Sequence, residues 1–214
     1  MTNNKLTTIY IVRHGETEFN VERIMQGHVD SPLTKKGLEQ AKYIANKFKD
    51  IKFKAVFSSD LPRAKRTAEI ITLYKKIAVI TSRILRERCW GRFDGKPIED
   101  YRKELRHIFD KFDGLNDKQK FTFKLDKTIE SDEQVIIRFL TFLREIAMAY
   151  LGKTILIVTH GSLLRTFLIH LGYGTYKELD FRQAKIENTA YTIIQSDGVD
   201  FFIKEVNGVT KAKT

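Results

Sequence analysis

The chain has 214 residues, of which 42% are hydrophobic, so it is long enough to bury one substantial core. Its 38 Lys and Arg residues outnumber its 27 Asp and Glu residues, and the resulting net charge of +11 favours anionic partners such as phosphate esters, nucleic acids or acidic lipid head groups. No apolar run approaches the ~20 residues that cross a bilayer, residues 9–12 are too short for a signal peptide, and the single Cys89 cannot form an internal disulfide. We therefore predict a cytoplasmic protein of one domain, with no membrane partner.

The first half of the chain alternates predicted strands and helices. Residues 7–12 are β-branched and apolar without a helical period, which predicts a buried strand that runs directly into Arg13 and His14. In residues 34–48 the apolar positions recur at helical spacing, and Thr34 is placed to cap that helix. A second strand is expected over residues 55–57, then a helix from Pro62 to Tyr74 that Arg63 opens, and a third strand over residues 77–80.

The second half continues the alternation and ends in a hairpin. Its predicted elements are a helical segment over 97–110, a polar stretch over 113–119, a long helix over 132–150, a buried strand over 154–158 that ends near His160, and two strands over 190–195 and 201–206 that flank the turn dipeptide Asp197-Gly198. A flexible tail is expected over 207–214, and a cap that sets specificity over 97–130. This order predicts a single three-layer α/β domain with a mostly parallel central sheet flanked by helices, whose ligand crevice lies at the carboxyl ends of the strands.

Four separated motifs share the order and placement found in one family. They are RHGETEFN at residues 13–20, SSDLPRA at 58–64, LRER at 85–88 and THG at 159–161. Single short matches arise by chance, but four of them in order on the expected elements are a specific signal. From about residue 8 to residue 171 the chain resembles the histidine phosphatase superfamily, which includes the cofactor-dependent phosphoglycerate mutases. The resemblance implies a phosphoglycerate mutase-like fold and a phosphatase that acts through phosphohistidine.

The residue types at the motifs fit this chemistry. A phosphate monoester is close to a dianion at neutral pH, so an attacking group needs cations around it. Arg13 and Arg63 lie at two predicted strand ends, where their planar forks can converge on one anion, with His160 donating from the opposite side. The same cations disfavour protonation of His14, which keeps its imidazole neutral and nucleophilic. His14 is therefore the predicted nucleophile.

Proton transfer requires a further group. A departing alkoxide needs a proton, and the water that attacks the intermediate must lose one, so a single carboxylic acid can serve both steps. Glu87 is the candidate, and the resemblance assigns it the same role. The resemblance also implies phosphate or substrate contacts from Asn20, Gln26 and the backbone of Gly27 and Gly161.

Other conspicuous residues have structural explanations. We interpret His28, His107 and His170 as ordinary turn or core residues. Glu16 and Glu18 have no further ligand at a spacing that would complete a metal site, so neither a metal nor another cofactor is expected. Cys89 lacks the downstream arginine of a cysteine phosphatase loop and is expected to pack beside Trp90.

Two alternative functions remain open at this point. A phosphoglycerate mutase would share every catalytic residue and return the phosphoryl group to its substrate, although the segment between Glu87 and His160 is short for the mutases. A basic protein that binds nucleic acid on an inert phosphatase fold would explain the charge, but no nucleic-acid motif accompanies it, so a small phosphorylated substrate is the expected partner. The oligomeric state and the identity of the substrate are left open.

Overall fold

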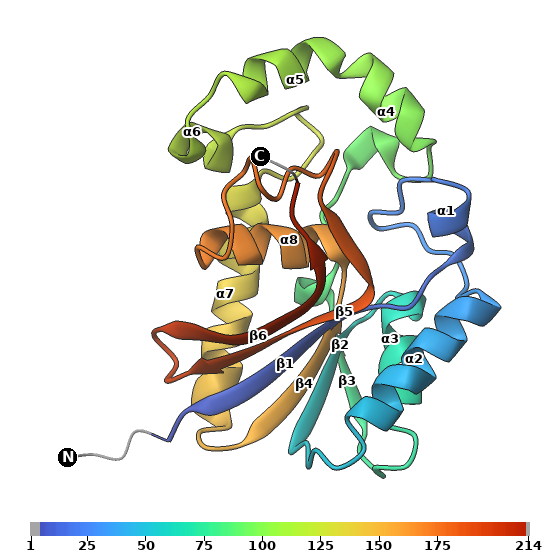
Figure 1. The fold of residues 1–214 in the computed structure, drawn as a ribbon, viewed down its shortest axis with the longest axis vertical. Coiled ribbons are helices and arrows are strands. Elements are labelled where there is room, and N and C mark those ends of the chain that lie inside the picture. The colour runs from blue at the N-terminus through green and yellow to red at the C-terminus, as the bar shows by residue number, and fades with distance from the viewer. Residues whose placement is uncertain (1–4, 213–214) are drawn as a thin grey trace.

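Six strands form one sheet in the order β3-β2-β4-β1-β5-β6 (Figure 1). The computed structural model describes residues 5–212. The strands are β1 (Thr7–Arg13), β2 (Ala55–Ser59), β3 (Val79–Ser82), β4 (Thr154–Thr159), β5 (Lys185–Ser196) and β6 (Phe201–Thr210). The first four pair in parallel, whereas β5 and β6 join antiparallel at one edge. The predicted α/β fold with a mostly parallel sheet is confirmed.

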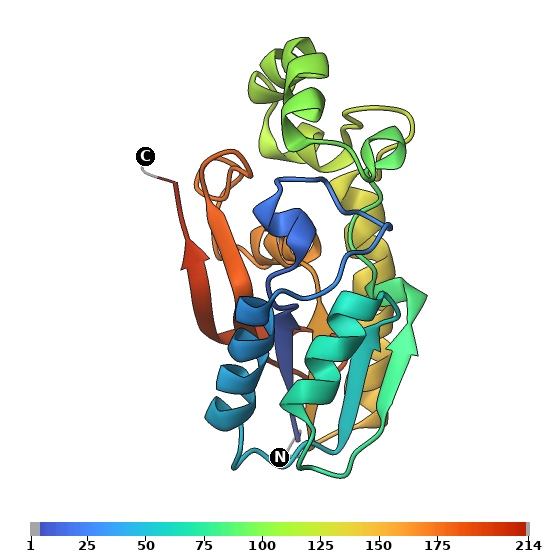
Figure 2. The same ribbon diagram turned by 90° about the vertical axis from the view of Figure 1, so that its right-hand side faces the viewer.

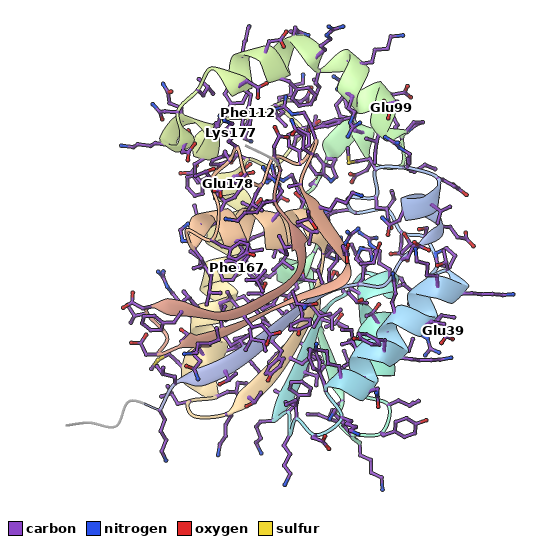
Figure 3. All side chains as sticks on the ribbon, viewed as in Figure 1. Glu39, Glu99, Phe112, Phe167, Lys177 and Glu178 are labelled. Atoms are coloured by element: carbon purple, nitrogen blue, oxygen red, sulfur yellow. The ribbon has the colours of Figure 1, made fainter. Side chains whose placement is uncertain are left out.

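Helices cover both faces of the sheet because residues along each strand alternate between two apolar cores. Ile9 and Ile11 of β1 pack with α7 (Asp132–Ala149) and α8 (Gly161–His170), where Phe167 lies between α8 and the strands (Figure 3). Tyr10 and Val12 instead pack with α2 (Lys35–Lys47) and α3 (Pro62–Ile71). Figure 2 shows α2 and α3 in front of the sheet and α7 behind it. The result is three layers.

Short elements lie over the carboxyl ends of the strands. They are α1 (Glu18–Val21), the 3₁₀ turns η1 (Arg83–Leu85) and η2 (Gly91–Phe93), and the cap helices α4 (Ile98–Glu104), α5 (Arg106–Asp113) and α6 (Asp117–Thr122). The cap helices arch above the sheet in Figure 1 and enclose a third cluster of buried residues, among them Phe93, Tyr101 and Phe109. The cap therefore has a small core of its own, and this packing holds the cap above the carboxyl ends of the strands.

Several element boundaries differ from the predictions. The segment over 97–110 is two helices because Leu105 departs from helical geometry (φ −96°, ψ 12°), and the polar stretch over 113–119 is partly helical because Asn116 caps α6. The helix from Pro62 ends at Ile71, three residues before Tyr74, and the third strand lies two residues later than expected. The helix α8 was not predicted, since its residues are apolar nearly all around, as is typical of a buried helix.

The tail predicted over 207–214 was placed too early. β6 continues through Thr210 because β5 also begins early, at Lys185, and pairs with it, so Val209 lies opposite Ile186. The next residue, Lys211, forms an ion pair with Glu178, with 2.9 Å between Nζ and Oε1. Residues 213–214 lie outside the described residues. The hairpin turn at Asp197-Gly198 is confirmed, with Gly198 at φ +96°. No helix within residues 5–212 has both the length and the apolar character needed to cross a membrane.

Candidate active site

Two neighbouring strand ends bring His14 and His160 together. β1 and β4 pair in parallel with Arg13 opposite Thr159, and the backbone N–H of His14 donates to the Thr159 carbonyl at 2.9 Å. The residue after each strand is therefore a histidine at the same edge of the sheet, and the two ring centroids lie 5.2 Å apart. Both imidazoles are buried.

The orientation of His14 leaves one ring nitrogen free to attack. Its Nδ1 lies 2.7 Å from the Gly15 carbonyl oxygen, which can only accept, so we assign the proton to Nδ1 and the lone pair to Nε2. Gly15 itself packs closely against Gly37 of α2, since a Cβ there would lie 2.5 Å from the Gly37 carbonyl oxygen. Burial, followed by the charges of Arg63 and Arg13, lowers the pKa of His14 well below its usual value of 6.5. The imidazole is therefore neutral at physiological pH.

Arg63 is fully buried at the start of α3, where sequence alone allowed an exposed first turn. Its Nη1 donates to the Val29 carbonyl and to Asp30 Oδ1, each at 2.7 Å, and its Nη2 donates to the Gly27 carbonyl at 2.8 Å. Its buried Nε has no protein partner within residues 5–212. Burial lowers the pKa of Arg63, with Asp30 opposing that effect. The guanidinium thus fixes the loop over 27–30 and keeps N–H groups available for an anion.

Arg13 is the second cation of this group. One of its Nη atoms donates to the Ile186 carbonyl, and its buried Nε has no partner in the described part of the chain. Burial, partly offset by Glu87, lowers the pKa of Arg13 to about 10, so the side chain remains charged at neutral pH. Gly161 lies against it, since a Cβ at Gly161 would be 3.0 Å from Arg13 Nε. The buried Arg63 and the half-buried Arg13 thus each keep an unpaired Nε donor near His14, an arrangement suited to binding an anion.

The carboxylate of Glu87 lies at the N-terminus of α8. Oε1 accepts the backbone N–H groups of Arg88 at 2.8 Å and Leu163 at 2.9 Å, and Oε2 accepts the N–H of Ser162 at 2.9 Å. A carboxylate has about four lone-pair sites, so Oε2 keeps one that no backbone donor occupies. The helix terminus therefore sets the position of Glu87 while leaving one oxygen able to bind a proton.

These groups surround a pocket of about 270 Å³ between the strand ends and the cap. Eight of the nine predicted site residues line it: Arg13, His14, Asn20, Gln26, Gly27, Arg63, Glu87 and Gly161. His160 does not, because it is completely buried beside His14, and its two ring nitrogens have no partner within residues 5–212. Burial and the neighbouring Arg63 lower the pKa of His160 well below 6.5.

Other pocket residues were not predicted. The cap and the segments around it contribute Trp90, Tyr101, Arg102 and Phe181, and α8 contributes Arg165. If a helix had been predicted after His160, Arg165 would have been expected one turn after Gly161 and on the same side of that helix. Nothing in the sequence indicated where the cap residues would lie. Within residues 5–212, no three His, Cys, Asp or Glu side chains lie close enough to hold a metal ion.

Comparison with known proteins agrees with this arrangement. The family model of the histidine phosphatase superfamily (branch 1) matches residues 9–208. The chain belongs to this superfamily. Among relatives, it is 36% identical over 189 residues to phosphoglycerate mutase-like protein 4 of Arabidopsis thaliana, covering 87% of this chain and 78% of the relative. It is 28% identical over 202 residues to the uncharacterized phosphatase PhoE of Bacillus subtilis, covering 94% and 95%.

A solved structure with similar sequence shares the fold. Bacillus stearothermophilus YhfR superposes with a TM-score of 0.81 at 34% identity, covering 94% of this chain and 96% of YhfR. The chain therefore shares its overall fold with this solved structure over nearly its whole length. Both phosphatase and mutase-like proteins occur among the relatives, so membership alone leaves the activity to be argued from the site.

Proposed function

We propose that the protein is a phosphomonoester hydrolase that acts on a small phosphorylated metabolite through a phosphohistidine on His14. The observation that carries this proposal is the hydrogen bond from His14 Nδ1 to the Gly15 carbonyl, which leaves a neutral Nε2 near the positive charges of Arg63 and Arg13. A nucleophile with this tautomer, beside cations that bind phosphate oxygens, is suited to attack at phosphorus. Arg13 and Arg63 would hold the non-bridging oxygens, assisted by His160.

In the first step, Nε2 of His14 forms a bond to phosphorus as the bond to the ester oxygen breaks. The proton on Glu87 Oε2 passes to that oxygen, and the alcohol leaves. The Gly15 carbonyl accepts from Nδ1 at 2.7 Å, and this hydrogen bond stabilises the positive charge that the ring gains. In the second step, water attacks phosphorus, Glu87 takes its proton, the nitrogen–phosphorus bond breaks and inorganic phosphate is released.

The intermediate provides the test. Brief incubation with p-nitrophenyl phosphate, followed by a base quench, should leave one acid-labile, base-stable phosphoryl group on the protein. His14→Ala should abolish this label, whereas His107→Ala, which removes an exposed histidine of α5, should retain it. All buffers contain EDTA, since the mechanism requires no metal. A label that persists in His14→Ala, or a strict requirement for a divalent ion, would contradict the proposal.

The same experiment separates hydrolysis from mutase activity. A hydrolase gives the phosphoryl group to water, so inorganic phosphate should appear in step with nitrophenol. A mutase retains the group until an acceptor hydroxyl takes it, so adding glycerate would divert phosphate into a new ester. Diversion of most of the phosphate would favour the mutase.

A further inference from the structure

Arg165 is a buried cation of the candidate pocket that phosphoryl transfer does not use. It lies on α8, is 7% exposed, and lines the pocket. Its Nε donates to the Leu179 carbonyl, but its two terminal nitrogens have no hydrogen-bond acceptor within residues 5–212, and no carboxylate there lies within 4.0 Å of them. These two nitrogens therefore keep N–H groups that no protein acceptor uses, and an anion in the pocket would supply one.

The acidic residues near Arg165 are already paired with other arginines. Asp132 forms a buried ion pair with Arg88, and Asp180 accepts from Arg182 Nε at 2.9 Å. Burial lowers the pKa of Arg165, and the charges of Asp132 and Asp180 oppose this shift only from a distance. The free N–H groups of Arg165 are therefore available to a ligand.

A second cation enters the same pocket from the cap. Arg102 of α4 lines the pocket, and its one ion pair within residues 5–212, with Glu99, is loose at 3.7 Å. Apolar and aromatic side chains lie among these groups and offer a surface for a carbon skeleton: Ile24, Met25, Trp90, Ile98, Tyr101 and Phe181. The pocket thus combines a phosphate site at the strand ends with two additional arginines.

The spacing along α8 limits the size of the ligand. Gly161 touches Arg13 at the phosphate site, and Arg165 follows on the same side of the helix, one turn or about 6 Å further along. We propose that the pocket accepts a compact phosphate monoester that carries a second anionic group, either a carboxylate or a second phosphate, and that Arg165 and Arg102 bind this group. The inference rests on the proposed phosphatase function and names its substrate class.

Matched pairs of esters test the inference with the wild-type protein. 3-Phosphoglycerate and glycerol 3-phosphate differ in a carboxylate, as do phosphoserine and phosphoethanolamine. Fructose 1,6-bisphosphate and fructose 6-phosphate differ in a second phosphate. The readout is phosphate release, expressed as the ratio of kcat/KM within each pair. At least one pair should favour the ester with the second anion by about tenfold or more, and the preferred pair identifies a carboxylate or a phosphate.

Variants then assign the preference to the two arginines. Arg165→Met and Arg102→Met should each reduce the ratio by about tenfold, the usual cost of losing a charge-assisted contact. Arg144→Met, which removes an exposed arginine of α7 outside the pocket, should retain it. If Arg165→Met does not fold, Arg102→Met on the cap surface decides the matter, and an unchanged ratio in that variant overturns the inference.

The inference and the proposed function fail in different ways. Turnover of p-nitrophenyl phosphate with no preference in any pair overturns the second-anion site and leaves the phosphatase intact. A wild-type protein that hydrolyses no ester, including p-nitrophenyl phosphate, contradicts the phosphatase function on which the inference rests.

Discussion

The side-chain amide of Asn188 donates to Oδ1 of Asn20 at 3.0 Å, across 168 residues of sequence. The same Oδ1 accepts the backbone N–H of Thr17 at 3.2 Å, so both of its lone pairs are occupied and the NH₂ group of Asn20 is left for the pocket that Asn20 lines. The β5 segment that carries Asn188 is irregular. Thr189 has φ +60°, an uncommon value for a β-branched residue, and its N–H donates to the His14 carbonyl at 3.2 Å.

This contact predicts that Asn188 acts through Asn20. Asn188→Ala should reduce kcat/KM for p-nitrophenyl phosphate by about tenfold because the Asn20 amide loses the partner that orients it. The Asn20→Ala and Asn188→Ala double variant should be no slower than Asn20→Ala alone, because coupled residues are non-additive. Asn207→Ala, on β6, is the control. If the losses of kcat/KM in the two single variants add up in the double variant, Asn188 does not position Asn20.

Removal of Arg63 should weaken both the anion site and the loop over 27–30. Arg63→Ala should cost roughly 2 to 5 kcal/mol of transition-state stabilisation, because a buried cation with free donors is lost next to the transferred group. Asp30→Asn keeps the guanidinium and removes only its ion pair at 2.7 Å, so its loss should be much smaller. Steady-state kinetics of both variants measure the difference. A decrease below tenfold in Arg63→Ala would place Arg63 outside the phosphate site.

Glu87→Gln should separate the two chemical steps. Transfer from an alkyl ester should slow by roughly 10² to 10⁴, the usual contribution of a general acid, whereas p-nitrophenyl phosphate expels a phenolate that needs little protonation. The second step still lacks its base, so rapid mixing with the aryl ester should show a burst of nitrophenol about equal to enzyme, followed by a slow steady rate.

The geometry of Glu87 also requires a control for stability. A glutamine oxygen can accept the N–H groups of Arg88 and Leu163, but its NH₂ group would then face the N–H of Ser162. Glu87→Gln should therefore be about 1 to 3 kcal/mol less stable, as measured by urea unfolding. Equal slowing of alkyl and aryl esters without a burst, in a variant that remains folded, would show that another acid donates the proton.

The buried histidines predict that stability falls as the solution becomes acidic. The folded-state pKa values of His14 and His160 lie well below 6.5, so below pH 6.5 the unfolded chain binds more protons than the folded one. Stability is therefore retained above that pH and lost as the pH falls toward the folded-state values, with a slope of about 1.4 kcal/mol per pH unit for each histidine. Urea unfolding between about pH 7.5 and 5.5 would measure this slope.

A variant isolates the contribution of the active-site residues. His170 also has a pKa lowered by burial, so the wild-type slope includes it. His14→Gln should reduce the slope by about 1.4 kcal/mol per pH unit in the same range, because glutamine does not bind a proton. An identical pH dependence in the wild type and this variant would mean that His14 is not buried in its neutral form.

The positions of the main strands and of the phosphate-binding motifs could be predicted from the sequence. Residues 154–158 form a run of apolar, β-branched residues bounded by polar ones, and the pattern placed β4 within one residue. Parallel strands bring their carboxyl ends to one edge, so His14 and His160 were expected together, and they lie there. Both inferences depend on regular backbone geometry, which a short stretch of sequence specifies.

Such local patterns did not predict the helix break in the cap. The helical periodicity over 97–110 continues through Leu105, and Tyr101, Leu105 and Phe109 all lie in the core of the cap, although the chain leaves helical geometry at Leu105. A spacing of four residues places these side chains on one face of a straight helix as well, so the apolar pattern gives no sign of the break. Only the tertiary structure therefore shows where the first helix of the cap ends.

The sequence by itself determined the family, the layered α/β fold and the group of residues at the strand ends, because strand periodicity and short motifs are local features. Only the tertiary structure decided which nitrogen of His14 is free, which oxygen of Glu87 can carry a proton, and that Arg165 reaches the pocket without an acidic partner. Each of these depends on contacts between distant segments, such as the N-terminus of α8 with Glu87, across 75 residues. Hydrogen bonds of that kind follow from how the layers pack.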